Sequence, residues 1–160
     1  YGDPARSIPS QLPDATVALP EGTTSAALRT FITGHGQGNA DNCAEFCPRD
    51  HTFTVNGQPS TQNIWRDDCR TTAAPNQQGT WQYARAGWCP GAKAYDWTID
   101  LGAVSEPSLT IGYDVQAFEN TCRPEASPCT GCTLGNGCAY NDSSHTEPNY
   151  QVSAVVIAYK

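Results

Sequence analysis

Two segments, residues 95–101 and 109–116, alternate large apolar side chains with polar or small ones at every second position. Successive side chains of an extended strand point to opposite faces, so this pattern predicts strands that bury one face. No segment shows a sustained repeat of apolar residues every 3.6 positions, which argues against a long amphipathic helix. The chain is therefore expected to fold from short β-strands.

Other segments extend this prediction along the chain. Residues 26–33 show the same alternation, and so do residues 51–55, which run into Asn56-Gly57. An Asn-Gly pair tolerates positive φ and predicts the turn of a hairpin. The apolar run at residues 155–157 predicts a central strand covered on both faces. Residues 1–25 contain four prolines and are expected to be an extended lead-in.

Short strands separated by Gly, Pro and Asn turns predict an all-β fold, an antiparallel β-sandwich of jelly-roll type. A length of 160 residues fits one domain, so we expect a single domain over residues 1–160. Residues 119–149 break the strand pattern and hold four cysteines. We expect this stretch to be one long, Cys-rich loop insertion stapled by disulfides.

The charge balance argues against two classes of partner. Nine Lys and Arg residues against sixteen Asp and Glu give a net charge of -7, which repels nucleic acid and anionic lipid surfaces. The longest apolar stretch, Ala154 to Tyr159, is far shorter than the roughly 18 residues that cross a bilayer. We therefore expect neither a nucleic-acid nor a membrane partner.

The cysteine usage points to an oxidising compartment. Eight cysteines and few lysines in 160 residues are typical of an exported protein whose thiols pair as disulfides. The chain has no methionine and starts at Tyr1, so we expect a mature or excised form. The predicted localisation is secreted, extracellular or periplasmic.

The sequence contains two sets of residues that could bind a metal ion. The pair Cys129 and Cys132, with His145 and two more cysteines nearby, has the spacing of a zinc half-site, but in an exported chain disulfides are favoured. His35 and His51 suggest the copper of jelly-roll monooxygenases, which also use methionine, and the chain contains none. We therefore predict no metal and no cofactor.

Two short segments carry the residues most suited to chemistry. Cys43 and Cys47 bracket Glu45, and a disulfide between them would fix the direction of the carboxylate. The segment from Arg85 to Gly91 places an arginine and a tryptophan beside another cysteine. Aromatic faces stack on sugar rings and a guanidinium stabilises a developing oxyanion, so this set suits a site that polarises a sugar-linked amide. The alternative is a surface glutamate beside a structural disulfide, with the tryptophan in the core.

Taken in order, these segments resemble the peptide:N-glycosidase F family, in particular the C-terminal of its two jelly-roll domains. The resemblance spans roughly Tyr1 to Gly91, with a weaker match in the last strand. The matching motifs are Leu28-Arg29-Thr30, Gly34-His35-Gly36, Cys43-Ala44-Glu45-Phe46-Cys47, Arg49 with His51, Gly79-Thr80-Trp81 and Arg85 to Gly91.

The resemblance implies roles for particular residues. It places Glu45 and Arg85 at the family's catalytic glutamate and arginine, and it implies substrate binding by Trp88, Phe46 and His35. It also implies two disulfides, Cys43 to Cys47 and Cys69 to Cys89. The remaining cysteines, Cys122, Cys129, Cys132 and Cys138, are expected to pair among themselves, in a pattern that the sequence leaves open.

Two functions follow as hypotheses. The first is an enzyme module: the Glu/Arg part of a secreted amidase that cleaves the bond between asparagine and an N-linked glycan. The principal acidic catalyst of the resembled family comes from the preceding domain, so we expect this chain to be inactive alone. The second is an extracellular structural or binding module that assembles with other protein chains through an open sheet edge. The expected partner is an N-glycan or glycoprotein in the first case and another chain in the second.

Overall fold

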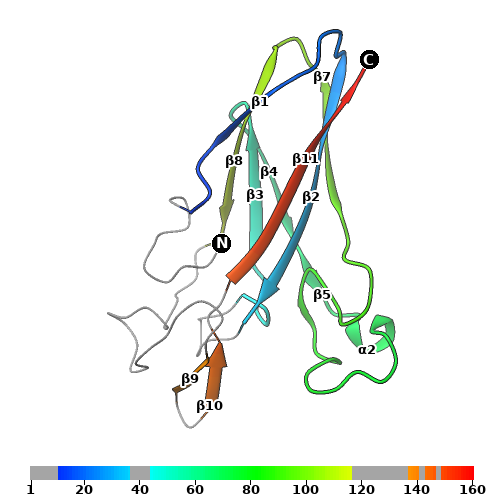
Figure 1. The fold of residues 1–160 in the computed structure, drawn as a ribbon, viewed down its shortest axis with the longest axis vertical. Helices are drawn as coiled ribbons and strands as arrows, with labels where there is room; N and C mark the ends of the chain where they lie inside the picture. The colour runs from blue at the N-terminus through cyan, green and yellow to red at the C-terminus, as the bar shows by residue number, and fades with distance from the viewer. Residues whose placement is uncertain (1–10, 37–43, 117–136, 141–142, 147–148) are drawn as a thin grey trace.

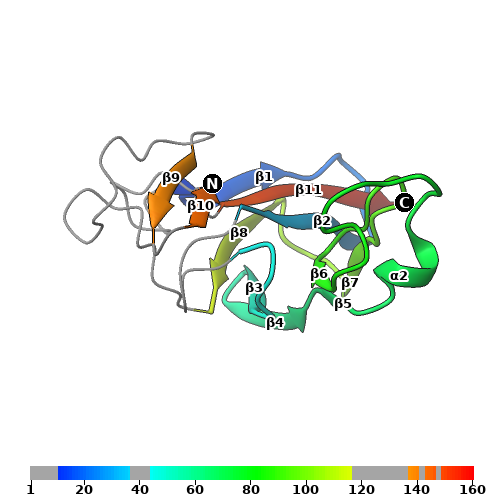
Figure 2. The same ribbon diagram turned by 90° about the horizontal axis from the view of Figure 1, so that it is seen from below.

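The computed structural model describes residues 11–36, 44–116, 137–140, 143–146 and 149–160. Within these residues two antiparallel sheets face each other as a sandwich (Figure 1). Figure 2 shows β11 and β2 in one layer and β3 and β4 in the other. The first sheet has the order β1 (Ala15–Ala18), β8 (Ser108–Val115), β3 (Asp50–Val55) and β4 (Gln58–Asn63). The second has the order β11 (Asn149–Tyr159), β2 (Ser25–His35) and β7 (Trp97–Ala103).

The core lies between the two sheets and follows the predicted alternation. On β2, Leu28, Thr30 and Ile32 are buried while Arg29 and Phe31 are exposed. The opposite sheet buries alternate residues of β3 against them. An all-β antiparallel sandwich of jelly-roll type is thereby confirmed.

The hairpin predicted at Asn56 and Gly57 is also confirmed. Their φ angles are 48° and 81°, so both central residues of the turn between β3 and β4 lie in the left-handed region. A two-residue turn of this kind matches the twist of the flanking strands.

The predicted strand at residues 95–101 begins two residues later than expected. The strand β7 starts at Trp97, and Tyr95 lies in the preceding loop with 60% of its surface exposed. Its ring covers the guanidinium of Arg66, whose carbon lies 4.0 Å from the ring centroid. Tyr95 thus contacts Arg66 of β5 (Trp65–Arg66), far away in the sequence, and is not part of a strand.

One further expectation was wrong. The run at residues 155–157 belongs to β11, which among the described strands pairs with β2 alone and lies at the edge of its sheet, and Val155 is 56% exposed. The strand is therefore neither central nor covered on both faces, because an apolar run does not determine where a strand lies in its sheet or what packs on its second face. In the predicted lead-in, the structure describes the strand β1 (Ala15–Ala18), which pairs with β8.

The stretch from 119 to 149 is not one continuous loop where the structure describes it. Two strands, β9 (Gly137–Tyr140) and β10 (Ser143–Thr146), form an antiparallel hairpin there. Cys122, Cys129 and Cys132 lie outside the described residues, as does the side chain of Cys138, so their pairing stays a prediction.

Three small elements complete the described fold, and they flank the candidate site at one end of the sandwich. They are β5 (Trp65–Arg66), which pairs with β6 (Arg85–Ala86), and the short helix α2 (Cys69–Thr72). Within the described residues, no helix has the length and apolar character needed to cross a bilayer.

Candidate functional site: a buried glutamate–arginine pair

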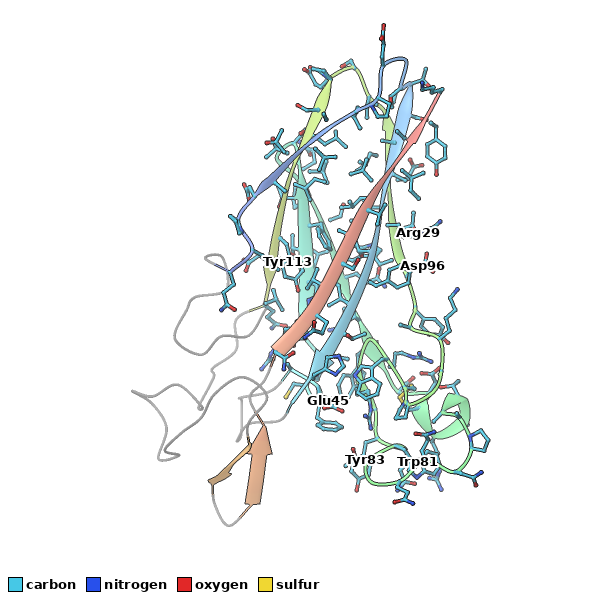
Figure 3. The ribbon with its side chains drawn as sticks, in the orientation of Figure 1. Arg29, Glu45, Trp81, Tyr83, Asp96 and Tyr113 are labelled. Atoms are coloured by element: carbon cyan, nitrogen blue, oxygen red, sulfur yellow. A yellow bond between two sulfur atoms is a disulfide. The ribbon has the colours of Figure 1, made fainter. Side chains whose placement is uncertain are left out.

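Three segments meet at one end of the sandwich: the end of β2, the loop that holds Glu45, and β6. The backbone N–H of Ala86 donates to the Glu45 carbonyl at 2.9 Å, and the Glu45 N–H donates to the Gly36 carbonyl at 3.2 Å. Figure 3 shows Glu45 beside this end of β2, with Tyr83 and Trp81 in the loop below it. Residues 36, 45 and 86 are thereby fixed next to one another.

Glycine is required where these segments approach most closely. A Cβ atom at Gly34 would lie 2.3 Å from the Ala44 carbonyl oxygen, and one at Gly87 would lie 1.9 Å from the Ile32 carbonyl oxygen. Such distances are well below van der Waals contact, and Gly87 also has a φ of +80°. Both glycines let the backbone carrying the site pack directly onto β2.

Glu45 and Arg85 form a direct ion pair. The Arg85 Nη1 atom lies 2.8 Å from Glu45 Oε1, and the Gly36 N–H donates to Glu45 Oε2 at 3.1 Å. Arg85 is only 2% exposed, and its other two nitrogens donate to the carbonyls of Thr80 and Tyr83. Each nitrogen of the guanidinium therefore has a protein acceptor, as a buried charge requires.

Aromatic rings surround this pair. The guanidinium carbon of Arg85 lies 4.7 Å from the ring centroid of Trp88 and 5.2 Å from that of Phe46. The Trp88 indole N–H donates to the Gly34 carbonyl at 2.8 Å, and the His35 ring centroid lies 5.2 Å from the Trp88 ring. The five residues singled out in the sequence, Glu45, Arg85, Trp88, Phe46 and His35, thus lie within one cluster.

Burial tunes the ionisation of two of these groups. It raises the pKa of Glu45 above its ordinary value, although the positive charge of Arg85 and the Gly36 N–H act in the opposite direction. Burial, together with the charge of Arg85, lowers the pKa of His35. His35 is therefore neutral near pH 7 and offers an uncharged aromatic ring.

The disulfide expectations can be followed in part. Cys69 and Cys89 form a disulfide with an S–S distance of 2.04 Å, which ties α2 to the segment after Trp88. Cys47 is also disulfide-bonded, but Cys43 lies outside the described residues, so this pairing stays a prediction. Asp68 lies close to Cys69 and Cys89, but disulfide sulfurs are not the thiolates that bind metals.

Four aspartates, at positions 41, 50, 67 and 68, lie nearest to Glu45 in the sequence, and the structure describes three of them. Asp50 accepts a hydrogen bond from Asn63 at 3.0 Å, and Asp68 forms a bidentate pair with Arg66. Asp67 lines a separate cavity, and Asp41 lies outside the described residues. Neither Asp50 nor Asp68 is therefore a candidate for a second carboxylate that acts with Glu45.

The Arg66–Asp68 pair was missed from the sequence. An arginine two residues before an aspartate is common on surfaces, and nothing in the local pattern indicates that Arg66 is buried to 4% exposure. The backbone acceptors of Arg85 were missed for a similar reason, because a carbonyl oxygen carries no residue-specific signal.

The fold and the buried ion pair define a disulfide-stabilised β-sandwich domain with an aromatic-lined glutamate–arginine cluster at one end. The family described as "Peptide-N-glycosidase F, C terminal" matches residues 6–136, and the chain belongs to this family. The resemblance noted in the sequence is thus confirmed, and the match extends beyond Gly91, where that resemblance largely ended.

Individual relatives agree with this assignment. Peptide-N(4)-(N-acetyl-beta-D-glucosaminyl)asparagine amidase F of Elizabethkingia miricola is 38% identical over 113 residues, which is 65% of this chain and 32% of the relative. The chain therefore spans about a third of that curated relative. PNGF-II has a similar structure, with a TM-score of 0.62, 21% identity and coverage of 91% of this chain and 24% of that one.

PNGase F, a glycosylasparaginase from Flavobacterium meningosepticum, is a second structural neighbour, with a TM-score of 0.59 and 24% identity. The similarity covers 91% of this chain and 42% of that structure. At these identities the two structures support the β-sandwich fold alone.

Proposed function

We propose that this chain carries the glutamate–arginine part of an amidase site that acts on the bond between asparagine and an N-linked glycan. The observation that carries the proposal is the Glu45–Arg85 ion pair, at 2.8 Å, set between the rings of Phe46 and Trp88 in a member of this family. The related protein from Elizabethkingia miricola is named as an amidase of this type.

The chemistry of the pair fits positioning and charge stabilisation. Amide hydrolysis requires a carboxylate that activates water and a positive or donor group near the developing oxyanion. Arg85 supplies a fixed positive charge, and Glu45 supplies a carboxylate oriented by Arg85 and Gly36. We infer that the carboxylate that activates water is supplied by a segment outside these 160 residues.

The aromatic residues give the proposed site its sugar specificity. Rings with an apolar face and a polar edge stack on the hydrophobic face of a pyranose. Trp88 is fixed through its indole N–H, and neutral His35 lies beside it. Phe46 completes the group on the other side of the guanidinium.

Glycan release from a denatured glycoprotein tests the enzymatic part of the proposal. The purified chain alone is expected to release no glycan, because loss of a general base costs about 100- to 10,000-fold in rate and loss of part of the cleft costs more. Release that disappears in Glu45→Gln but persists in Glu21→Gln, an exposed control, would contradict the proposal that the base lies elsewhere.

The proposed localisation is outside the cytoplasm. The Cys69–Cys89 disulfide and eight cysteines in the chain support it, since such bridges persist in oxidising compartments. A single domain over residues 1–160, with residues 119–149 as a Cys-rich insertion, is a further part of this proposal.

A structural module is the second candidate, and two observations favour it. Arg85 is 2% exposed, and each of its guanidinium nitrogens donates a hydrogen bond within the protein. An ion pair of this kind would also be expected if its role were only to stabilise the fold. Among the strands that the structure describes, the 11-residue β11 lies at a sheet edge, and an edge strand can pair with a strand of another chain. Light scattering separates the candidates: this alternative requires stable higher-order assembly, and the enzyme module does not.

A further inference from the structure

A cavity of about 350 Å³ lies beside the candidate site, on the side of the sandwich where β4 and β7 form the sheet edges. Neither Glu45 nor Arg85 lines it, but Gly87 does, so the segment from Arg85 to Trp88 separates the two places. Thr30 and Ile32 of β2 also line the cavity. Its remaining walls come from β4, from residues 64–68, which include β5, and from Trp97 of β7 with the two residues before it.

Three aromatic side chains line this cavity: Trp65, Tyr95 and Trp97. Tyr95 is 60% exposed, but one face of its ring is held against the Arg66 guanidinium at 4.0 Å. Trp97 packs edge-on against Phe53, with ring centroids 5.7 Å apart. Aromatic surfaces that are held in place lose little freedom when a ligand stacks on them.

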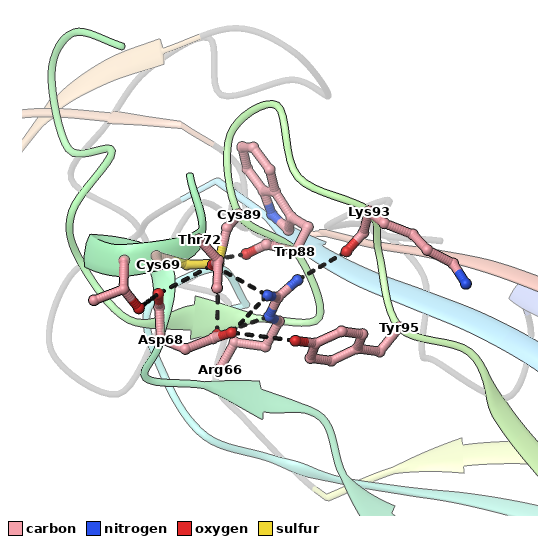
Figure 4. Close-up of polar contacts among 9 residues, drawn as sticks. Arg66, Asp68, Cys69, Thr72, Trp88, Cys89, Lys93 and Tyr95 are labelled. Atoms are coloured by element: carbon pink, nitrogen blue, oxygen red, sulfur yellow. Dashed lines mark hydrogen bonds and ion pairs between the residues drawn. A yellow bond between two sulfur atoms is a disulfide. The ribbon is translucent and has the colours of Figure 1, made fainter. Parts of the chain in front are cut away.

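The Arg66 cluster explains why Tyr95 is held (Figure 4). Arg66 Nε and Nη2 lie 2.9 and 2.8 Å from the two carboxylate oxygens of Asp68, and Nη1 donates to the Lys93 carbonyl at 3.0 Å. The Tyr95 hydroxyl donates to Asp68 at 3.3 Å. The adjacent Cys69–Cys89 disulfide ties down the neighbouring backbone.

The same pairing leaves little uncompensated charge around the cavity. Asp68 forms an ion pair with Arg66. Asp96 forms a second ion pair, in which its carboxylate lies 3.5 Å from Arg29 Nε. Figure 3 shows Arg29 and Asp96 next to each other. Asp67 is the lining carboxylate without an ion pair among the described residues. Gln62 and Asn63 add two neutral amides, so a ligand meets amide groups, one unpaired carboxylate and carboxylates that already have an arginine partner.

We propose that this cavity binds the ring of a neutral saccharide. Aromatic faces, an amide and a carboxylate are groups that a pyranose satisfies at once, through its apolar face and its hydroxyls. An anionic ligand would meet Asp67 and a chain of net charge -7, and a purely apolar ligand would displace water from Gln62 and Asp67 without offering them a hydrogen bond. The inference is independent of the proposed function, because it uses neither Glu45 nor Arg85.

Nuclear magnetic resonance of the four indole N–H groups in the full chain gives a direct test. Trp65 and Trp97 line the cavity, Trp88 belongs to the Glu45–Arg85 cluster, and Trp81 lies in neither group. Titration with the methyl glycosides of glucose, mannose, galactose and N-acetylglucosamine should shift the Trp65 and Trp97 signals saturably with at least one sugar. No shift at either signal with all four, or shifts at Trp88 alone, would overturn the proposal.

Variants and competing ligands sharpen this test. Gln62→Ala and Asp67→Asn should each weaken saccharide binding by about 2- to 10-fold, the usual effect of one lost hydrogen bond. Tyr95→Ala should weaken it as well, whereas Tyr159→Ala removes an exposed ring outside the cavity and should not. Glucuronate should bind more weakly than methyl glucoside. Equal binding of glucuronate, or binding of choline in place of every sugar, would contradict a site for neutral saccharides.

Discussion

The guanidinium of Arg85 lies 2.8 Å from the carboxylate of Glu45, although 40 positions separate the two residues in the chain. The contact is supported by the backbone hydrogen bond from the Ala86 N–H to the Glu45 carbonyl. It also relies on Gly34 and Gly87, which let the backbones of Ala44 and Ile32 lie close to them. Because Arg85 is buried, the pair is an integral part of this end of the sandwich as well as its candidate site.

Removing Arg85 should destabilise the fold strongly. Breaking a buried ion pair leaves an uncompensated charge, which typically costs about 3 to 5 kcal/mol. We expect Arg85→Ala to lower the free energy of unfolding by an amount of this order in urea titrations. Arg70→Ala, which removes an exposed arginine of α2, is the control, and an equal effect of the two substitutions would show that the pair is not structurally important.

Gly87 and Gly22 provide a matched pair for the close approach to β2. Both have a φ of +80°, but a Cβ at Gly22 has nothing within 4 Å, whereas one at Gly87 meets the Ile32 carbonyl at 1.9 Å. Gly22→Ala should cost about 1 kcal/mol or somewhat more from the backbone alone. Gly87→Ala should cost clearly more in the same unfolding measurement. Similar costs would mean that the backbone can move away from β2 without penalty.

Stability should depend on pH through His51. This residue is fully buried, its Nδ1 lies 2.7 Å from the Tyr113 hydroxyl, and the Tyr150 ring packs edge-on against it at 4.7 Å. Burial lowers the pKa of His51 from 6.5 to about 4, although the charge of Asp50 opposes the change.

The sign of the effect follows from proton binding. Between pH 6.5 and about 4 the unfolded chain holds a proton on His51 that the folded chain does not, so the free energy of unfolding should fall as pH falls through this window. The full loss is roughly 3 kcal/mol. His51→Gln should reduce the slope of stability against pH in this range. An unchanged slope would show that His51 does not titrate in this way.

The Cys69–Cys89 bridge should contribute to stability as well. It links residues 20 positions apart, and a loop of this size is worth about 3 kcal/mol in the chain-entropy account. A Cys69→Ser and Cys89→Ser double variant should unfold at correspondingly lower urea concentration. It should also release Tyr95 and Asp68 from their fixed positions, which the indole signal of Trp65 would report. An unaltered unfolding midpoint would contradict this role.

The alternation at residues 26–33 was enough to predict a strand that buries one face. Leu28, Thr30 and Ile32 are buried together because successive side chains of a strand point to opposite faces, whereas the burial of Ala27 on the other face does not follow from the pattern. Sheet order is not encoded in this way, so the edge position of β11 was missed. Tyr95 was assigned to a strand because it continues the local alternation. A local pattern cannot reveal its contact with Arg66, which is far away in the sequence.

The side chains of the candidate site could be predicted from residue identity, whereas its backbone groups could not. Glu45 and Arg85 lie in short motifs next to cysteines, and the structure places them in contact. The carbonyls of Thr80 and Tyr83, which hold the other nitrogens of Arg85, are backbone atoms and leave no trace in residue type. The separate cavity at Trp65 and Trp97 joins strands whose pairing only the fold determines.

Calorimetric titration of the intact chain with N,N′-diacetylchitobiose tests the central claim most directly. The account predicts saturable binding, weakened at least several-fold in Arg85→Lys, because lysine cannot reproduce the planar, multiply bonded guanidinium. The Glu21→Gln control should bind as the unmodified chain does, and circular dichroism should show that each variant is folded. Absence of binding to the folded, unmodified chain, or binding that Arg85→Lys leaves unchanged, would contradict the assignment of Glu45 and Arg85 to a glycan site.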